Sequence, residues 1–229
     1  MQVSGASSIS CCSSLIACGC NEGIIRLFET ETLLYNATLP RPLADDPDYI
    51  EFNNKKLPDV KSVVISSDGC RLCALYADRS VLVFDISNVK NVTRVYSSMC
   101  HMRCVWDVAC FPPNTFTEFP RGGFITAAAD NSVRIWHMPN ESSSSSSAAA
   151  DAAAASLHPL SSDMCRMTFM SERTPTDSVR CLKISPDFSK LITGDKAGRV
   201  KMFSLPSVKL LCSIDAHEAE VRLSTRKHN

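Results

Sequence analysis

The sequence predicts an all-β protein that repeats a four-stranded unit four times. The first observation is a turn residue followed, six positions later, by an aromatic residue. It occurs as Glu22/Phe28, Asp78/Phe84, Asp130/Trp136 and Ala197/Phe203. The second is that apolar residues between turn and aromatic alternate with others, which is the period-2 pattern of a strand. The third is that apolar stretches flank each segment, so that every unit can form a small antiparallel sheet.

Each aromatic segment is the second arm of a predicted hairpin. The first arms begin at Leu15, Arg71, Phe124 and Lys190. Three units have a further strand upstream, beginning at Val60, Val105 and Val179. The last strands of the units are expected in the stretches that begin at Leu33, Thr93, Met164 and Lys209. Each unit is therefore predicted to have four strands, although no upstream strand is evident in the first.

This pattern resembles the WD-repeat family, whose four-stranded units are the blades of a β-propeller. The resemblance implies that four residues lock a blade through a hydrogen-bond relay from Asp to His to Thr to Trp. The third unit has all four, as His101, Thr126, Asp130 and Trp136. Read without the resemblance, Thr, His and Asp together suggest a nucleophilic triad. We favour the structural role.

The other units keep the aromatic, as Phe28, Phe84 and Phe203, but not the whole relay. The departures from the family pattern are Cys18 and Glu22 in unit one, Ala74 in unit two and Ala197 in unit four. The Trp106-Asp107 pair falls in a first strand, so its likeness to the family's Trp-Asp signature is interpreted as a coincidence.

The spacing of the units predicts about four blades and the start of a fifth, which is an incomplete ring. His217 stands four residues before Val221, as His101 does before Val105, so a fifth blade is expected to begin there. The predicted divisions are 1–139 for blades one to three, 140–159 for a Ser/Ala-rich disordered insertion, 160–221 for the end of blade three, blade four and the start of blade five, and 222–229 for a divergent tail. The insertion is interpreted as a tolerated surface expansion; a phosphorylated regulatory loop is the alternative.

A more specific resemblance lies in the strings GCNEGIIRLF, VWDVACFPP, GGFITAAADNSVRIW and DAHEAEV. They are similar to the family of WD-repeat scaffolds for c-Jun N-terminal kinase signalling, which includes a mitogen-activated protein kinase binding protein and a spindle-pole relative. The resemblance implies a non-catalytic scaffold in the cytoplasm, the centrosome or the spindle pole, with kinase-pathway or spindle proteins as partners. The alternative is a WD-repeat subunit of a ribonucleoprotein or ribosome-assembly complex.

The composition argues against that alternative and against other classes. Lys plus Arg and Asp plus Glu are 24 each, so the chain lacks the excess of positive charge that nucleic-acid binding requires. No apolar run approaches the roughly 18 residues that span a bilayer. No phosphate-binding GxxxxGK occurs, and Cys70-x-x-Cys73 lacks the second pair of a zinc site. We therefore expect no enzyme activity, no cofactor, no metal, no nucleic acid and no membrane.

Partner contacts are expected on the polar turns of the blades. The candidates are Arg79, Asn131 and Lys196, whose side chains should be exposed beside the locking turns. An open ring also leaves the first and last blades without neighbours, so self-association through these edges is expected.

Overall fold

The computed structural model describes residues 5–41, 57–99, 101–138, 165–170 and 178–221. In these residues sixteen strands form four sheets of four strands, and each sheet is an antiparallel meander in which neighbours in the chain are neighbours in the sheet. The predicted all-β fold with four four-stranded units is confirmed. The Ser/Ala-rich insertion 140–159 and the tail 222–229 lie outside the described residues.

The blades follow one another along the chain. Blade 1 contains β1 (Ala6–Cys11), β2 (Leu15–Cys20), β3 (Ile25–Glu29) and β4 (Tyr35–Thr38), with a short 3-10 turn η1 (Asn21–Gly23). Blade 2 contains β5 (Val60–Ile65), β6 (Arg71–Tyr76), β7 (Val81–Asp85) and β8 (Thr93–Ser98). Blade 3 contains β9 (Val105–Phe111), β10 (Gly123–Ala128), β11 (Ser132–His137) and β12 (Cys165–Met170). Blade 4 contains β13 (Val179–Ile184), β14 (Lys190–Asp195), β15 (Arg199–Ser204) and β16 (Leu210–Asp215).

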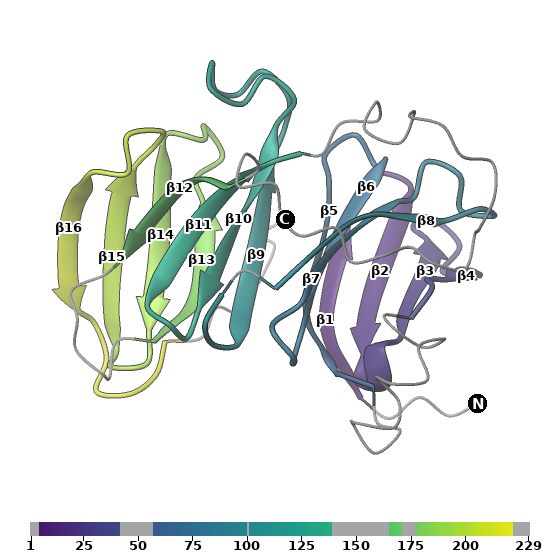
Figure 1. The fold of residues 1–229 in the computed structure, drawn as a ribbon, viewed down its shortest axis with the longest axis horizontal. Helices are drawn as coiled ribbons and strands as arrows, with labels where there is room; N and C mark the ends of the chain where they lie inside the picture. Colours follow the sequence, from purple (N-terminus) through teal and green to yellow (C-terminus); the bar gives the residue numbers. More distant parts are fainter. Residues whose placement is uncertain (1–4, 42–56, 100, 139–164, 171–177, 222–229) are drawn as a thin grey trace.

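The first strands of successive blades lie side by side, β1 against β5, β5 against β9 and β9 against β13. In Figure 1 the last strands of the end blades, β4 and β16, lie at opposite ends of the molecule. The blades are therefore arranged as an arc with their first strands inward.

A strand that the sequence did not predict, β1, begins blade 1. Its sequence, ASSISC, has almost no apolar alternation. Its serines instead satisfy backbone groups of the next blade, because the amides of Val63 and Ile65 donate to the Oγ atoms of Ser8 and Ser10 at 3.0 Å each. Polar residues are thus favoured on this inner strand, and a search for apolar alternation misses it.

Each of the three interfaces between blades contains a hydrophobic cluster, and three of the four blade aromatics belong to these clusters. Phe84, Trp136 and Phe203 each pack toward the preceding blade and are 1%, 1% and 8% exposed. Phe28 occupies the same position in blade 1, where the described residues place no preceding blade, and it is only half-buried. Its ring contacts Tyr35 edge to face, with centroids 6.2 Å apart. Among the described residues, therefore, no other blade covers this face of blade 1.

At the other end of the arc the chain continues across blade 4. The amide of Val221 donates to the carbonyl of Asp195 at 3.1 Å. A Cβ added at Gly194 would lie 2.6 Å from Cγ1 of Val221, just as one at Gly19 would lie 2.5 Å from Cγ1 of Val60. Val221 thus covers blade 4 as Val60, the first residue of blade 2, covers blade 1. Val221 lies where the sequence predicts the start of a fifth blade; the blade itself stays a prediction, because residues 222–229 lie outside the described residues.

The close contact between Gly19 and Val60 generates a prediction. A methyl group at residue 19 must displace Val60, and such overpacking costs about 1 to 3 kcal/mol. Gly19→Ala should lower the melting temperature by several degrees, measured by circular dichroism. In the background Val60→Ala the same change should cost clearly less, because the clashing methyl group is absent. A Gly19→Ala protein that melts like the parent would contradict the packing described.

Candidate functional site: the blade lock and the loop face

Hydrogen bonds connect the four residues that the WD-repeat pattern marks in blade 3. Oδ2 of Asp130 lies 3.3 Å from Nδ1 of His101, and Nε2 of His101 lies 2.8 Å from Oγ1 of Thr126. Nε1 of Trp136 donates to the same hydroxyl at 2.9 Å. If His101 carries its proton on Nδ1, every donor has an acceptor, because Thr126 then receives the indole proton and donates its own to Nε2.

The carboxylate of Asp130 also fastens the hairpin turn. Its Oδ1 accepts bonds from the amide and the hydroxyl of Ser132 at 3.0 and 2.5 Å, and its Oδ2 accepts the amide of Met102 at 2.8 Å. Burial opposes ionisation of this group, but the hydrogen bonds from His101, Ser132 and Met102 prevail and hold the pKa of Asp130 well below its ordinary value. Asp130 is therefore an anion near neutral pH.

The burial of these groups distinguishes a structural hydrogen-bond relay from a nucleophilic triad. His101 and Thr126 are both buried, and the Thr126 hydroxyl is shared between an imidazole and an indole. A nucleophile needs an open side from which a substrate can approach. The geometry is that of an internal brace between the loop before β9, the strand β10 and the strand β11.

The other blades contain parts of this brace. Asp78 repeats the turn of Asp130, and its Oδ1 accepts the amide and hydroxyl of Ser80 at 2.9 and 2.6 Å. In blade 4, where Ala197 occupies the turn position, Asp195 accepts the amides of Ala197 and Arg199 at 2.9 Å each. Sequence reasoning missed Asp195 because it lies two residues before the expected position. By strand register, Cys18, Ala74 and Thr193 stand where Thr126 stands in blade 3.

Asp107 joins three blades, a role that the sequence interpretation missed. Its Oδ1 accepts the hydroxyl of Ser62 in blade 2 at 3.3 Å, and its Oδ2 accepts the amide of Leu182 in blade 4 at 3.0 Å. Burial raises the pKa of Asp107, and hydrogen bonds from the amides of Leu182 and Val108 oppose that rise. The Trp106-Asp107 pair lies in β9, as the register predicts, but Asp107 is a contact between blades.

A signal for this contact exists in the sequence. The residue two positions after the start of each first strand is polar or a cysteine: Ser8, Ser62, Asp107 and Cys181. Ser8 accepts an amide of blade 2 as Asp107 accepts an amide of blade 4. Aligning the first strands by their starting residues would have drawn attention to this position.

The three candidate partner residues occupy the same end of the blades, with different exposure. Arg79 and Lys196 are exposed. The expectation of exposure is wrong for Asn131, which is half-buried because the loop before β9 packs against its turn through the bonds from Met102 to Asp130 and from Ala129 to the carbonyl of Cys104. Arg79 and Asn131 both have left-handed backbone conformations, with φ of 78° and 68°. Nη1 of Arg79 donates to the carbonyl of Met102 at 3.2 Å, so this side chain reaches the next blade.

Neither a cluster of metal-binding side chains nor a membrane-spanning helix occurs in the residues that the structure describes. No three side chains of His, Cys, Asp or Glu gather there in a way that suits a metal ion. None of its helices has the length and apolar character needed to cross a membrane.

Comparisons with known proteins agree with this geometry. The family model "WD domain, G-beta repeat" matches residues 92–137 and 164–204. The human protein named mitogen-activated protein kinase-binding protein 1 is 28% identical over 251 residues, which cover 94% of this chain and 16% of that protein. The pig protein named WD repeat-containing protein 62 is 28% identical over 246 residues, which cover 96% of this chain and 16% of that protein. A chain in the crystal structure of a mitotic checkpoint complex superposes with a TM-score of 0.66 at 12% identity, covering 96% of this chain and 54% of that one.

The chain therefore contains WD40 repeats, and its described residues form four-stranded blades of the β-propeller type. Its curated homologues are mitogen-activated protein kinase-binding protein 1 and WD repeat-containing protein 62. It spans 16% of the length of these relatives.

The shared hydroxyl of Thr126 generates a second prediction. Thr126→Val keeps the shape but leaves Nε2 of His101 and Nε1 of Trp136 without their buried partner. Each loss costs about 1 to 3 kcal/mol, so the melting temperature should fall by on the order of 10 °C. The matched control is Thr193→Val in blade 4, where the aromatic is Phe203 and has no N–H to lose. Equal losses in the two variants would contradict the relay.

The lowered pKa of Asp130 generates a third prediction. Because its pKa is lower in the folded than in the unfolded protein, the stabilisation is complete above the unfolded-state pKa of about 4 and is lost as pH falls through the folded-state pKa. The difference in urea midpoint between the parent and Asp130→Asn should therefore be constant from pH 7 to 5 and shrink below about pH 4. A difference that does not change with pH would count against an ionised, hydrogen-bonded Asp130.

Proposed function

We propose that this chain is a non-catalytic platform for protein interaction within a scaffold of c-Jun N-terminal kinase signalling or of the spindle pole. One observation carries the proposal. The polar groups of blade 3 that are capable of chemistry are buried and bonded to one another, whereas the turns of blades 2 and 4 on either side present the exposed side chains of Arg79 and Lys196. Such an arrangement supplies a rigid surface rather than a reactive centre.

The names of the relatives support the kinase part of the proposal. One curated relative is named for binding a mitogen-activated protein kinase. We extend a kinase-pathway partner and a location in the cytoplasm, centrosome or spindle pole to this chain. Membership of a ribonucleoprotein complex is the alternative, and the zero net charge of the chain argues against it.

The experiment for partner binding uses purified c-Jun N-terminal kinase and the 229-residue chain in biolayer interferometry. Lys196→Glu should weaken binding and leave the melting temperature unchanged, because Lys196 is exposed. Lys190→Glu is the control, an equal charge change at the start of β14, the opposite end of that strand from the Lys196 turn. Absence of kinase binding to the parent chain would reject the kinase partner. Salt-sensitive capture of a labelled RNA would favour the ribonucleoprotein alternative.

We also propose that the open edges of the arc associate. Register places Ile9, Phe28 and Tyr35 on the open face of blade 1, where Ile9 is 66% and Tyr35 59% exposed. On the open face of blade 4, Ile192, Val200 and Met202 are half-buried and Ile214 is 55% exposed. The corresponding faces between blades 1 to 4 are covered by a neighbour. Apolar faces of this kind favour contact with another sheet.

The test of association is sedimentation equilibrium of the 229-residue chain. We expect a mass above the 25.1 kDa of one chain, reduced toward that value by Phe28→Asp. The control is Met102→Asp, which places the same charge on an exposed apolar side chain in a loop instead of on the open face. A stable monomer across the concentration range would contradict this part of the proposal.

A further inference from the structure

The first strand of blade 1 exposes a residue whose counterparts in the other blades are buried. Ile9 pairs with Cys18, and Val63, Val108 and Leu182 occupy the matching register position in β5, β9 and β13. These three side chains are 4%, 6% and 1% exposed, and each belongs to the hydrophobic cluster shared with the preceding blade. Ile9 is 66% exposed. It is therefore an interface residue that no preceding blade covers among the described residues.

The turn before the fourth strand shows the same contrast. Leu33, Val92 and Val208 each lie two residues before the residue that pairs with the blade aromatic in blades 1, 2 and 4. Val92 and Val208 pack against the hydrophobic clusters that join their blades to the preceding ones, whereas Leu33 is exposed. Blade 1 thus presents the apolar surface that blades 2 and 4 bury. We call Ile9, Phe28, Leu33 and Tyr35 the front face of blade 1.

Blade 4 shows the corresponding contrast on the side that faces away from blade 3. Ile214 pairs with Val200 in the outer strand of this blade. Leu39 and Ser98 occupy the matching position in blades 1 and 2, on the side of the following blade, and both are buried. Ile214 is exposed. We call Ile192, Val200, Met202 and Ile214 the back face of blade 4.

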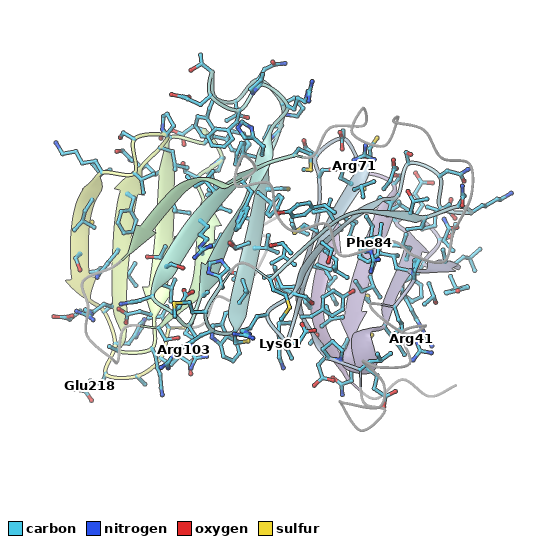
Figure 2. All side chains as sticks on the ribbon, viewed as in Figure 1. Arg41, Lys61, Arg71, Phe84, Arg103 and Glu218 are labelled. Carbon is cyan, nitrogen blue, oxygen red and sulfur yellow. The ribbon has the colours of Figure 1, made fainter. Side chains whose placement is uncertain are left out.

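The front face of blade 1 and the back face of blade 4 are the two halves of one kind of interface. At each of the three interfaces within the chain, the front of one blade, with its aromatic residue, lies against the back of the blade before it. Phe84, labelled in Figure 2, lies at the first of these interfaces and packs against the strands of blade 1. Four blades joined in one direction leave one front and one back uncovered, so the chain carries both halves.

Arg26 lies on the same side of blade 1 as Ile9, because both pair with Cys18. Arg134 and Lys201 have the same register position as Arg26 in blades 3 and 4, where a preceding blade is present. Lys201 is buried there. The apolar stem of a basic side chain packs well inside an interface. Arg26 is therefore compatible with a covered front face.

We propose that the back face of blade 4 binds the front face of blade 1 of a second copy of this chain. Ile9 and Phe28 of one copy are then covered by the sheet that contains Met202 and Ile214 of the other. Two such contacts join two copies head to tail, because each chain supplies one front and one back. The pair has eight blades, within the range of about four to eight in closed β-propellers. The inference rests on the proposed association of the open edges and names the two surfaces that meet.

The segment that ends at Val221 lies at the edge of the back face and competes with the second copy. Val221 lies against Gly194, the place that the first residue of the next first strand takes between blades 1 and 2. The first strand of a second copy begins at Ala6 and needs the same place. Val221 is held there by a hydrogen bond from its amide to the carbonyl of Asp195 and by one from Sγ of Cys181 to its carbonyl at 3.5 Å. Docking of the second copy therefore displaces Val221.

The test measures the dimer dissociation constant of matched variants by sedimentation equilibrium. Ile9→Asp and Ile214→Asp make the same change at an exposed isoleucine on each face. We expect the parent at twice the 25.1 kDa of one chain, and each variant alone to bind itself at least about tenfold more weakly. Their equimolar mixture should bind at least about threefold more tightly than either variant alone, because one chain keeps its back face and the other its front face. The control Val95→Asp, at an exposed valine of β8, should change the constant less than about twofold.

Val221→Ala gives a second readout, of opposite sign. Because this change weakens the competing segment, it should tighten the dimer about threefold, although it removes apolar surface. The melting temperature of each variant shows that it is folded. If either aspartate variant does not fold, Ile9→Ser and Ile214→Ser replace the pair, with an expected loss of about threefold each.

A loss in Ile9→Asp with none in Ile214→Asp would mean that two front faces meet, and it would overturn the inference while the proposed association stands. A mixture that binds no more tightly than its components, or a Val221→Ala variant with a weaker dimer, would also overturn it. A parent chain that stays a monomer at all concentrations would reject the inference and the proposed association together, and would leave kinase binding to its own test.

Discussion

The structure depends on the packing of each four-stranded sheet against the one before it. Phe84, Trp136 and Phe203 fill the three interfaces, and burying a side chain of this size contributes about 2 to 3 kcal/mol. A single sheet of this kind has two faces to cover, and only blades 2 and 3 have both neighbours among the described residues. The half-buried Phe28 and the chain segment that ends at Val221 are the two ends of the same repeating interface.

Polar contacts add geometric specificity to this apolar packing, because hydrogen bonds are directional. The relay through His101 and Thr126 fixes one hairpin to the loop before β9, and Asp107 fixes three first strands relative to one another. In these contacts, carboxylates and hydroxyls form hydrogen bonds inside the protein.

The sequence predicted the hairpins well, because their apolar alternation and turn residues are local signals. It also predicted which four residues meet in blade 3. It did not predict β1, because the serines of this strand accept hydrogen bonds from amides of the next blade and give no apolar alternation. It also missed Asp195, whose carboxylate accepts the turn amides in blade 4 although it lies two residues before the expected turn position, Ala197. Asp107 and the half-burial of Asn131 depend on contacts between segments distant in the chain, which a local pattern does not contain.

Hydrogen exchange of the backbone amides tests the central claim, that neighbouring blades stabilise one another, most directly. With mass spectrometry on the 229-residue chain, the account predicts the slowest exchange in β6, β7, β10 and β11 of blades 2 and 3, and the fastest among the strands in β4 and β16. Equal protection in all four blades, or the strongest protection in blade 1 or blade 4, would contradict the claim.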